Sequence, residues 1–208
     1  MVQAILFDAD GVLVDPGEMH YQAFNRALAT HGWCITRLEH RTVYNGLPTR
    51  AKLDKLTQEK GLPLELHRIV LLDKERFTRQ TILEYLDPDP VKIELLKALK
   101  ADGFALAACS NMIQGALMLM MEQVKLSPYL DVVIGNDLQR PAKPQPHLYR
   151  AAAALVGHQP ATCAIVVDGP VSLQAARAAH PADVVEVDGP GAVDLSLFPR
   201  LTRFWAAA

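Results

Sequence analysis

A short apolar run at residues 2–7 that ends in two aspartates, Asp8 and Asp10, constrains the fold of this chain more than any other feature. The run lacks the alternation of a half-exposed strand, so it predicts a strand that is buried on both faces. Such strands belong to parallel α/β sheets, whose sites lie at the carboxyl ends of the strands. Gly11 allows the backbone to turn away without a side chain in the site. We therefore expect Asp8 at the carboxyl edge of a sheet.

The spacing of the two aspartates suits phosphoryl transfer through a covalent aspartate. Asp8 can attack phosphorus and form an aspartyl-phosphate, which divides one difficult displacement into two easier ones. Asp10 can protonate the leaving alcohol and then accept a proton from the attacking water. Two carboxylates this close repel each other, and a hard cation relieves the repulsion and neutralises the incoming phosphate. We therefore expect Mg²⁺ as the cofactor.

The pattern of the remaining sequence divides the chain into two regions. Residues 16–86 show helical periodicity throughout, for example in the spacing of Tyr21, Phe24 and Leu28. From residue 87, helices alternate with short apolar strands, which is typical of a doubly wound parallel sheet. The predicted strands are residues 104–108, 132–135, 163–167 and 184–187, and the predicted helices are residues 91–101, 113–126, 147–156 and a helix through 175–179. Residues 1–15 and 87–208 are thus expected to form an α/β core, with residues 16–86 inserted as a small α-helical domain.

Polar residues follow two of the later strands. Ser110 and Asn111 come after residues 104–108, and Asp168 comes after residues 163–167. A Ser-Asn pair is also typical of a helix cap, so this pair alone does not define a site. The second interpretation is that the pair lies near Asp8, because the carboxyl ends of parallel strands meet at one edge of the sheet.

A proline-rich segment, Lys143-Pro144-Gln145-Pro146, offers a positive charge. Lys143 can stabilise the negative charge that a phosphoryl group spreads over its oxygens. Pro146 is expected to open a helix as its first residue, while Pro144 stiffens the approach. The alternative is a solvated lysine in a surface loop.

These motifs, in this order, resemble the haloacid dehalogenase superfamily in its phosphatase and phosphomutase branch. The resemblance implies a Rossmann-like core with an inserted helical cap. It also implies that Asp8 is the nucleophile, Asp10 the acid and base, and Lys143 the phosphate-binding cation. Ser110 is expected to donate a hydrogen bond to the transferring phosphoryl group. The implied ligands of Mg²⁺ are Asp8, Asp10 through its carbonyl, and Asp168.

The segment after the predicted strand at residues 163–167 departs from the family pattern. The family usually carries two acids there, either adjacent or four residues apart. In this chain Val167 and Ser172 stand at the two places where an acid beside Asp168 would lie. Mg²⁺ needs only one or two carboxylates. We therefore expect magnesium binding that is weaker than the family norm.

The resemblance also implies substrate-binding residues. Asn111 lies beside Ser110, and Gly46 and Arg50 lie in a segment similar to the family's substrate-contacting cap loop. His20 stands near the expected hinge, and Lys74 is a further candidate. Each has a simpler interpretation: a lone histidine as a core or surface residue, the Gly46 segment as a turn before a helix, and Lys74 as part of a solvated charged face.

Composition excludes several other classes. With 208 residues, a formal charge of -2 and 50% hydrophobic residues, the chain has no basic face for nucleic acid and can bury a large core. No apolar stretch approaches a membrane span, and no basic leader precedes the first strand. Cys34, Cys109 and Cys163 are scattered and are expected to be reduced. These features favour a cytoplasmic enzyme without a nucleic-acid or membrane partner. With the motifs and the family resemblance above, the expected partner is a small phosphorylated molecule, and the expected state is a monomer or small homo-oligomer.

The leading hypothesis is a magnesium-dependent phosphatase that hydrolyses a small phosphorylated metabolite, a sugar phosphate in the first instance. A β-phosphoglucomutase-like phosphomutase is the alternative within the same chemistry. A catalytically weakened binding or regulatory protein is the alternative from another class, and Val167, Gly169 and Ser172 motivate it.

Overall fold

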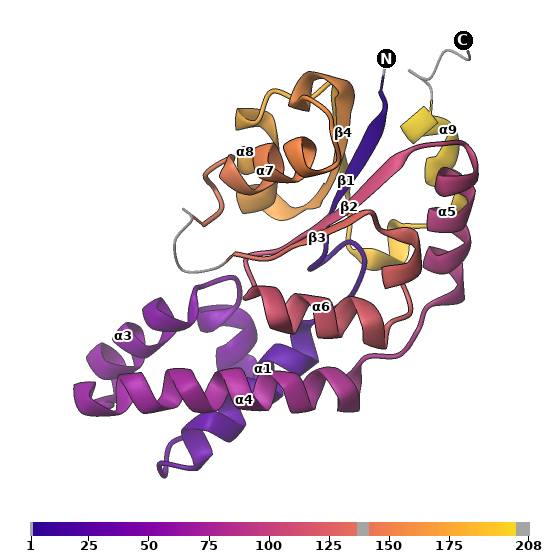
Figure 1. Cartoon of the computed structure of the whole chain (residues 1–208). Helices are drawn as coiled ribbons and strands as arrows, with labels where there is room; N and C mark the ends of the chain where they lie inside the picture. Colours follow the sequence, from indigo (N-terminus) through magenta and orange to yellow (C-terminus); the bar gives the residue numbers. More distant parts are fainter. Residues whose placement is uncertain (1, 137–141, 203–208) are drawn as a thin grey trace. The chain divides into compact units, whose positions relative to one another are not determined.

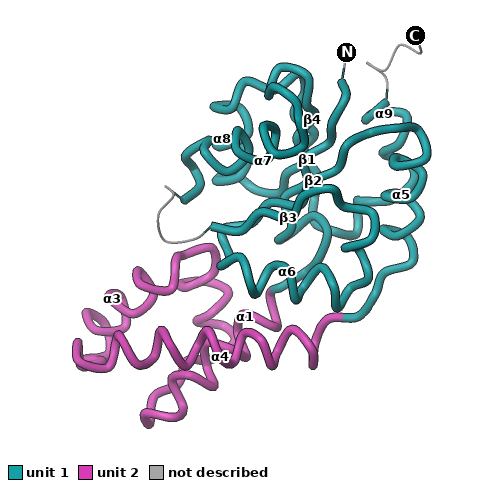
Figure 2. The backbone as a smooth tube through the Cα atoms, in the orientation of Figure 1, with its two compact units in different colours: residues 1–16, 87–208 teal, residues 17–86 magenta. Residues whose placement is uncertain are grey.

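A computed structural model describes residues 2–136 and 142–202 of the chain. The chain forms two compact units (Figure 2). Unit 1 consists of residues 1–16 and 87–208, and unit 2 consists of residues 17–86.

Unit 1 is built on a five-stranded parallel sheet. Its strands are β1 (Ala4–Asp8), β2 (Ala105–Cys109), β3 (Val132–Ile134), β4 (Cys163–Asp168) and β5 (Asp183–Val187), in the spatial order β3-β2-β1-β4-β5. All five residues of β1 are buried, as predicted for a strand covered on both faces. Asp8 lies opposite Cys109 in the register, and Phe7 lies opposite Val166. The residues that follow β1, β2 and β4 therefore meet at one edge of the sheet, which confirms the doubly wound α/β core.

Helices cover both faces of this sheet. Figure 1 shows α7 and α8 on one face and α5 and α6 on the other. The helices of unit 1 are α5 (Pro90–Ala101), α6 (Gln114–Gln123), α7 (His147–Leu155), α8 (Gly169–Ala178) and the short α9 (Phe198–Thr202). Asp89 accepts a hydrogen bond from the backbone N of Val91 at the start of α5, where Pro90 has no N–H that needs an acceptor. Pro146 caps α7 instead of opening it, which corrects its predicted place by one residue.

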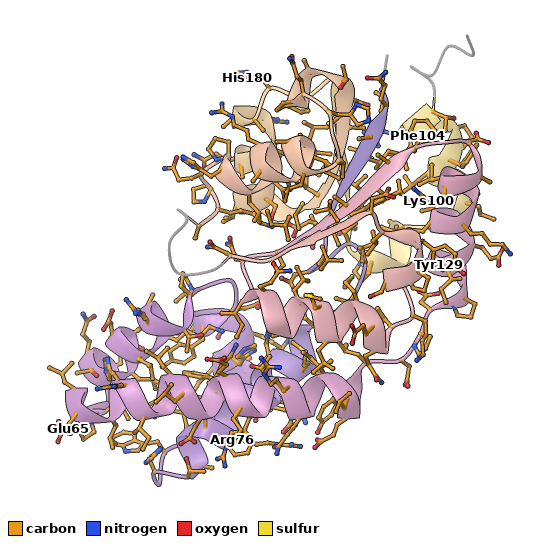
Figure 3. The ribbon with its side chains drawn as sticks, viewed as in Figure 1. Glu65, Arg76, Lys100, Phe104, Tyr129 and His180 are labelled. Carbon is orange, nitrogen blue, oxygen red and sulfur yellow. The ribbon has the colours of Figure 1, made fainter. Side chains whose placement is uncertain are left out.

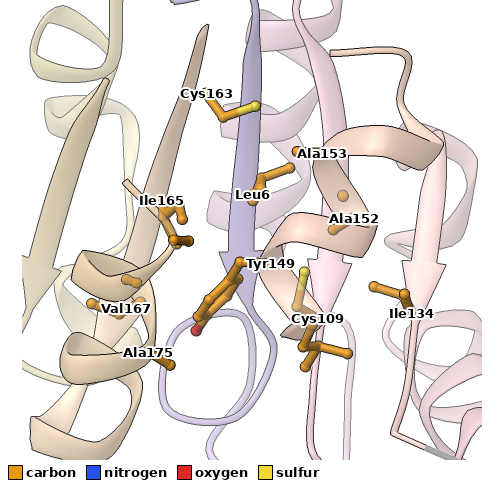
Figure 4. Packing of buried hydrophobic residues seen from close by; sticks show 14 of the residues in the cluster. Leu6, Cys109, Ile134, Tyr149, Ala152, Ala153, Cys163, Ile165, Val167 and Ala175 are labelled. Atoms are coloured by element: carbon orange, nitrogen blue, oxygen red, sulfur yellow. The ribbon is translucent and has the colours of Figure 1, made fainter. Parts of the chain in front are cut away.

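The core beneath α7 and α8 is apolar and closely packed (Figure 4). Leu6 and Ile165 from the sheet lie in one cluster with Ala152 and Ala175 from the helices, whose small side chains let helix and sheet approach. Each buried Leu or Ile contributes about 1.5–3 kcal/mol to stability through burial. Cys109 and Cys163 are buried free thiols of this core, and Cys34 is an exposed free thiol.

Unit 2 is helical throughout, as predicted. Its elements are α1 (Gly17–Ala29), α2 (Arg37–Glu39), the π-helical turn η1 (His40–Tyr44), α3 (Thr49–Lys60), the 3₁₀ turn η2 (Leu64–Leu66) and α4 (His67–Tyr85). Phe24 and Leu28 of α1 pack with Leu53 and Leu56 of α3 and Val70 of α4. This shared apolar cluster gives unit 2 a core of its own.

Charged side chains occupy the surface of both units. Figure 3 shows Arg76 on α4 and Lys100 on α5, which pair with Asp73 and Asp131 respectively. Among the described residues, no helix has both the length and the apolar character needed to cross a membrane.

Candidate active site

Asp8, the last residue of β1, is held in a buried ion pair. Lys143 Nζ donates to Asp8 Oδ1 at 2.6 Å, and the two side chains are 4% and 2% exposed. Burying two charges is unfavourable unless they are paired at close range. The contact therefore places Lys143 in the site, which excludes the alternative of a solvated loop lysine.

Asp10 is held by the residue that follows β2. Ser110 Oγ donates to Asp10 Oδ2 at 2.6 Å and accepts from the backbone N of Met112 at 2.9 Å. The next helix begins only at Gln114, and its N-cap is Ile113. Of the two interpretations of Ser110, the helix cap is therefore wrong, and the position beside the aspartates is the one that the structure has.

Asn111 contacts protein backbone in this structure. Its Oδ1 accepts a hydrogen bond from the backbone N of Lys143 at 3.0 Å. The bond joins the end of β2 to the segment that carries Lys143. Asn111 therefore helps to position Lys143, although the two residues lie 32 positions apart in the sequence.

Asp168, at the end of β4, lies against the turn that follows Asp10. Gly11 has φ +79°, and a Cβ at this position would collide with Asp168 Oδ2. The pKa of Asp168 is raised, first by burial and then by the negative charges of Asp8, Asp188 and Glu186. The glycine is thus required both for its backbone conformation and for the close approach of this carboxylate.

The donor atoms at this edge fit Mg²⁺. Carboxylate and carbonyl oxygens are the ligands that hard cations prefer, and Asp8, Asp168 and the carbonyl of Asp10 offer them. Negative charge that raises the pKa of Asp168 is what a bound cation would neutralise. Within residues 2–136 and 142–202, no group of three or more His, Cys, Asp or Glu side chains is arranged to hold a metal, so the fit rests on two carboxylates and a carbonyl.

Two residues that were not predicted as site residues from the sequence form hydrogen bonds with Asp8 and Lys143. Tyr149 Oη donates to Asp8 Oδ2 at 3.4 Å, and Lys143 Nζ donates to Ser172 Oγ at 3.4 Å. Tyr149 is fully buried, and burial together with the charge of Asp8 raises its pKa, so it remains a donor. Figure 4 shows Tyr149 beside the carboxyl end of β1. Its place on the first turn of α7, six residues after Lys143, is the only sequence signal that could have indicated it.

Val167 belongs to the core and not to the site. It is fully buried and packs in the same cluster as Ala175 and Tyr149. Successive residues of a strand point to opposite faces, so Val167 and Asp168 diverge. The missing second acid is therefore replaced by an apolar contact.

The remaining predicted site residues all lie in unit 2. Gly46 and Arg50 are exposed, and Arg50 lies in the first turn of α3. His20 on α1 and Lys74 on α4 are half-buried. Their contact with a substrate stays a prediction.

Comparisons with known proteins identify the class. The model of the haloacid dehalogenase-like hydrolase family matches residues 2–180. The chain therefore belongs to this family and is an enzyme of the hydrolase class, as its sequence motifs indicated.

Several proteins that are similar to this chain are named as phosphatases. The chain is 28% identical over 178 residues to a phosphoglycolate phosphatase of Aquifex aeolicus, covering 86% of this chain and 81% of that protein. It is 25% identical over 186 residues to a phosphorylated carbohydrates phosphatase of Thermotoga maritima, covering 86% and 82%. A crystal structure of β-phosphoglucomutase from Clostridium difficile has the same fold, with a TM-score of 0.77, 17% identity and 98% of each chain covered.

Proposed function

We propose that this enzyme is a magnesium-dependent phosphatase that hydrolyses a small phosphorylated metabolite, a sugar phosphate in the first instance, through an aspartyl-phosphate. The observation that carries the proposal is the ion pair of 2.6 Å between Asp8 and Lys143 at the carboxyl end of β1. It holds a carboxylate and a cation together at the edge where Asp10, Ser110 and Asp168 also converge. The family and the names of its curated relatives support the same chemistry.

The first step transfers the phosphoryl group to Asp8. A carboxylate oxygen of Asp8 forms a bond to phosphorus while the bond from phosphorus to the ester oxygen breaks. Asp10, in its protonated form, gives its proton to the departing alcohol. Lys143 neutralises charge on the phosphoryl oxygens, and Ser110 donates its hydroxyl proton to one of them.

The second step regenerates the enzyme. Asp10, now a carboxylate, takes a proton from a water molecule that attacks phosphorus. The bond between phosphorus and the Asp8 oxygen breaks, and inorganic phosphate leaves. Before the substrate binds, Ser110 donates its single hydroxyl proton to Asp10 Oδ2 and positions this carboxylate; this is the same proton that it gives to a phosphoryl oxygen during the reaction.

Mg²⁺, when bound by Asp8, Asp168 and the Asp10 carbonyl, would supply charge neutralisation to the phosphate and to the carboxylates. Because Val167 contributes no oxygen, we propose that the ion is held more weakly than is usual in the family. Tyr149 and Ser172 act as positioning residues, since they contact Asp8 and Lys143 respectively.

We further propose that Asn111, Gly46, Arg50, His20 and Lys74 bind the part of the substrate that does not react. Two of the curated relatives are named for phosphoglycolate and for phosphorylated carbohydrates, which favours small phosphate esters as the partner. The cytoplasmic location and the state as monomer or small homo-oligomer stay predictions from the sequence.

Phosphate release from a panel of phosphorylated metabolites, with Mg²⁺ and with a chelator, tests this function. Asp8→Asn should lower the rate by at least about a thousandfold, because an amide cannot form the covalent intermediate. Asp102→Asn is the matched control, since Asp102 is an exposed residue after α5, and it should keep the wild-type rate. Transfer of the phosphoryl group from Asp8 to a sugar phosphate, which forms a bisphosphate, would indicate a phosphomutase. Binding of a metabolite without phosphate release would indicate a regulatory protein. Either result contradicts the proposal.

A further inference from the structure

Ser172 occupies one of the two places where the family pattern has a second acid. It lies on α8, four residues after Asp168, and is half-buried. Lys143 Nζ donates a hydrogen bond to Ser172 Oγ at 3.4 Å. Val167, at the other place, packs in the apolar core. Of the two departures from the family pattern, Ser172 is therefore the one that contacts the residues of the active site.

The described surroundings of the Lys143 ammonium group combine one carboxylate with neutral groups. Asp8 Oδ1 lies 2.6 Å from Nζ, Ser172 Oγ lies at 3.4 Å, and the centroid of the Tyr149 ring lies at 5.4 Å. Burial and the charge of Asp8 raise the pKa of Tyr149, so its hydroxyl stays protonated and neutral. Asp8 and Lys143 thus form a buried pair in which the two charges cancel.

An acid at position 172 would change this balance of charge. A carboxylate would approach the same ammonium group from the side of α8, and the buried cluster would then carry one net negative charge. Buried charges interact more strongly than surface charges, because water and salt screen them less. The hydroxyl of Ser172 accepts the hydrogen bond of Lys143 and adds no charge.

One unit of charge at this edge of the sheet acts on two ligands with opposite signs. The phosphate group of the substrate is an anion, whereas Mg²⁺ is a cation, and both would bind beside Asp8. A carboxylate close to Lys143 would repel the first and attract the second. A neutral group at the same position therefore favours the anion at the expense of the cation.

We infer that Ser172 sets the balance between phosphate binding and Mg²⁺ binding in this active site, because it holds Lys143 without adding a negative charge. The inference rests on the proposed function and deepens it by assigning the affinity for phosphate to one position. Ser172 acts through Lys143 and is therefore a positioning residue. Its effect is electrostatic, so it has a sign that a loss of packing does not reproduce.

Isothermal titration calorimetry of the full chain tests this inference in two titrations. The first adds Mg²⁺ to the metal-free protein, and the second adds inorganic phosphate at a concentration of Mg²⁺ that saturates each variant. Ser172→Asp should lower the Kd for Mg²⁺ by about tenfold and raise the Kd for phosphate by about tenfold to a hundredfold. A distorted site would instead weaken the binding of both ligands.

Two variants control for shape and for remote charge. Ser172→Asn introduces a side chain of the same shape as aspartate without its charge. Gln174→Glu adds a negative charge at an exposed position of the same helix, where solvent screens it. Both should keep the two Kd values within about threefold of the wild type.

Two further variants keep the inference testable if Ser172→Asp does not fold. Ser172→Glu carries the same charge and should give shifts of the same sign. Ser172→Ala removes the hydroxyl without changing the charge, so it should leave both Kd values within about threefold of the wild type. A change of more than tenfold in Ser172→Ala would contradict the electrostatic explanation.

Unchanged Kd values in a folded acidic variant, a shift of both in the same direction, or no measurable binding of phosphate to the wild type would overturn the inference. Release of phosphate from the metabolite panel by the wild type would in that case still support the phosphatase. Absence of release from the whole panel would instead overturn the proposed function, so the two failures are distinguishable.

Discussion

The two units of this molecule treat buried charge in opposite ways. In unit 1, the ammonium group of Lys143 lies 2.6 Å from the carboxylate of Asp8, and both side chains are almost fully buried. In unit 2, the ammonium group of Lys52 is 8% exposed and lies over the ring of Phe24, among other basic groups. The first charge is compensated by the protein itself, whereas the second has no comparable internal partner among the described residues.

This difference separates two kinds of buried lysine. A charge that the protein pairs internally is fixed in position before any ligand arrives, which suits a group that must act on a transition state. A buried charge that the protein leaves without a counterion costs free energy in the folded state. The two lysines should therefore respond in opposite directions when the charge is removed.

Lys143→Met should cause the largest change. Removing one partner leaves Asp8 buried and uncompensated, so the free energy of unfolding should fall by about 3–5 kcal/mol. The rate of phosphate release should fall by about a hundredfold to a thousandfold, because the phosphoryl charge loses its cation. Denaturant unfolding and initial rates measure the two effects.

Lys100→Met is the control for this variant, since Lys100 pairs with Asp131 at the surface, where an ion pair contributes about 0–1 kcal/mol. A loss of stability as small as that of Lys100→Met would show that the pair of Lys143 and Asp8 is not structurally important.

Lys52→Met should change the free energy of unfolding in the opposite direction. Replacing a buried charge without a counterion by an apolar side chain of similar volume should raise the free energy of unfolding by about 1–2 kcal/mol, even though the contact with Phe24 is lost. Thermal unfolding without ligand should show a Tm higher by roughly 2–8 °C. A lowered Tm would mean that Lys52 is structurally compensated, and the contrast between the two units would disappear.

Tyr149→Phe should have the smallest effect. Its hydroxyl donates to Asp8 Oδ2 over 3.4 Å, a long hydrogen bond, so its loss should lower kcat by about two- to tenfold and leave KM unchanged. Steady-state kinetics separates the two constants. A change in KM alone would place Tyr149 in substrate binding instead of in the positioning of the nucleophile.

Much of unit 1 could be predicted from the sequence because its signals are local. The hydrophobic pattern and the turn residues between elements predict the apolar strands and the polar residues at their carboxyl ends, which are Asp8, Ser110 and Asp168. Parallel strands bring such residues together at one edge of the sheet. The order β3-β2-β1-β4-β5 was not predictable in the same way, because it depends on how the crossovers pack.

Contacts between distant elements account for what the sequence did not show. Tyr149 lies 141 residues from Asp8, and their contact depends on how α7 packs on the sheet. Lys52 occurs in a polar segment that resembles a solvated helix face, and only the packing of α3 with α1 and α4 makes it buried. Val167 could be recognised as a departure from the family pattern, but its place in the core required the structure.

The most direct test of the central claim is chemical capture of the phosphorylated nucleophile. The enzyme is mixed with a substrate and Mg²⁺, quenched during turnover and reduced with borohydride, which converts an aspartyl-phosphate to homoserine. Peptide mass spectrometry should then find homoserine at position 8 in the wild type and not in the sample without substrate. An unmodified Asp8 under conditions of continuing phosphate release, or homoserine at another position, would contradict the account.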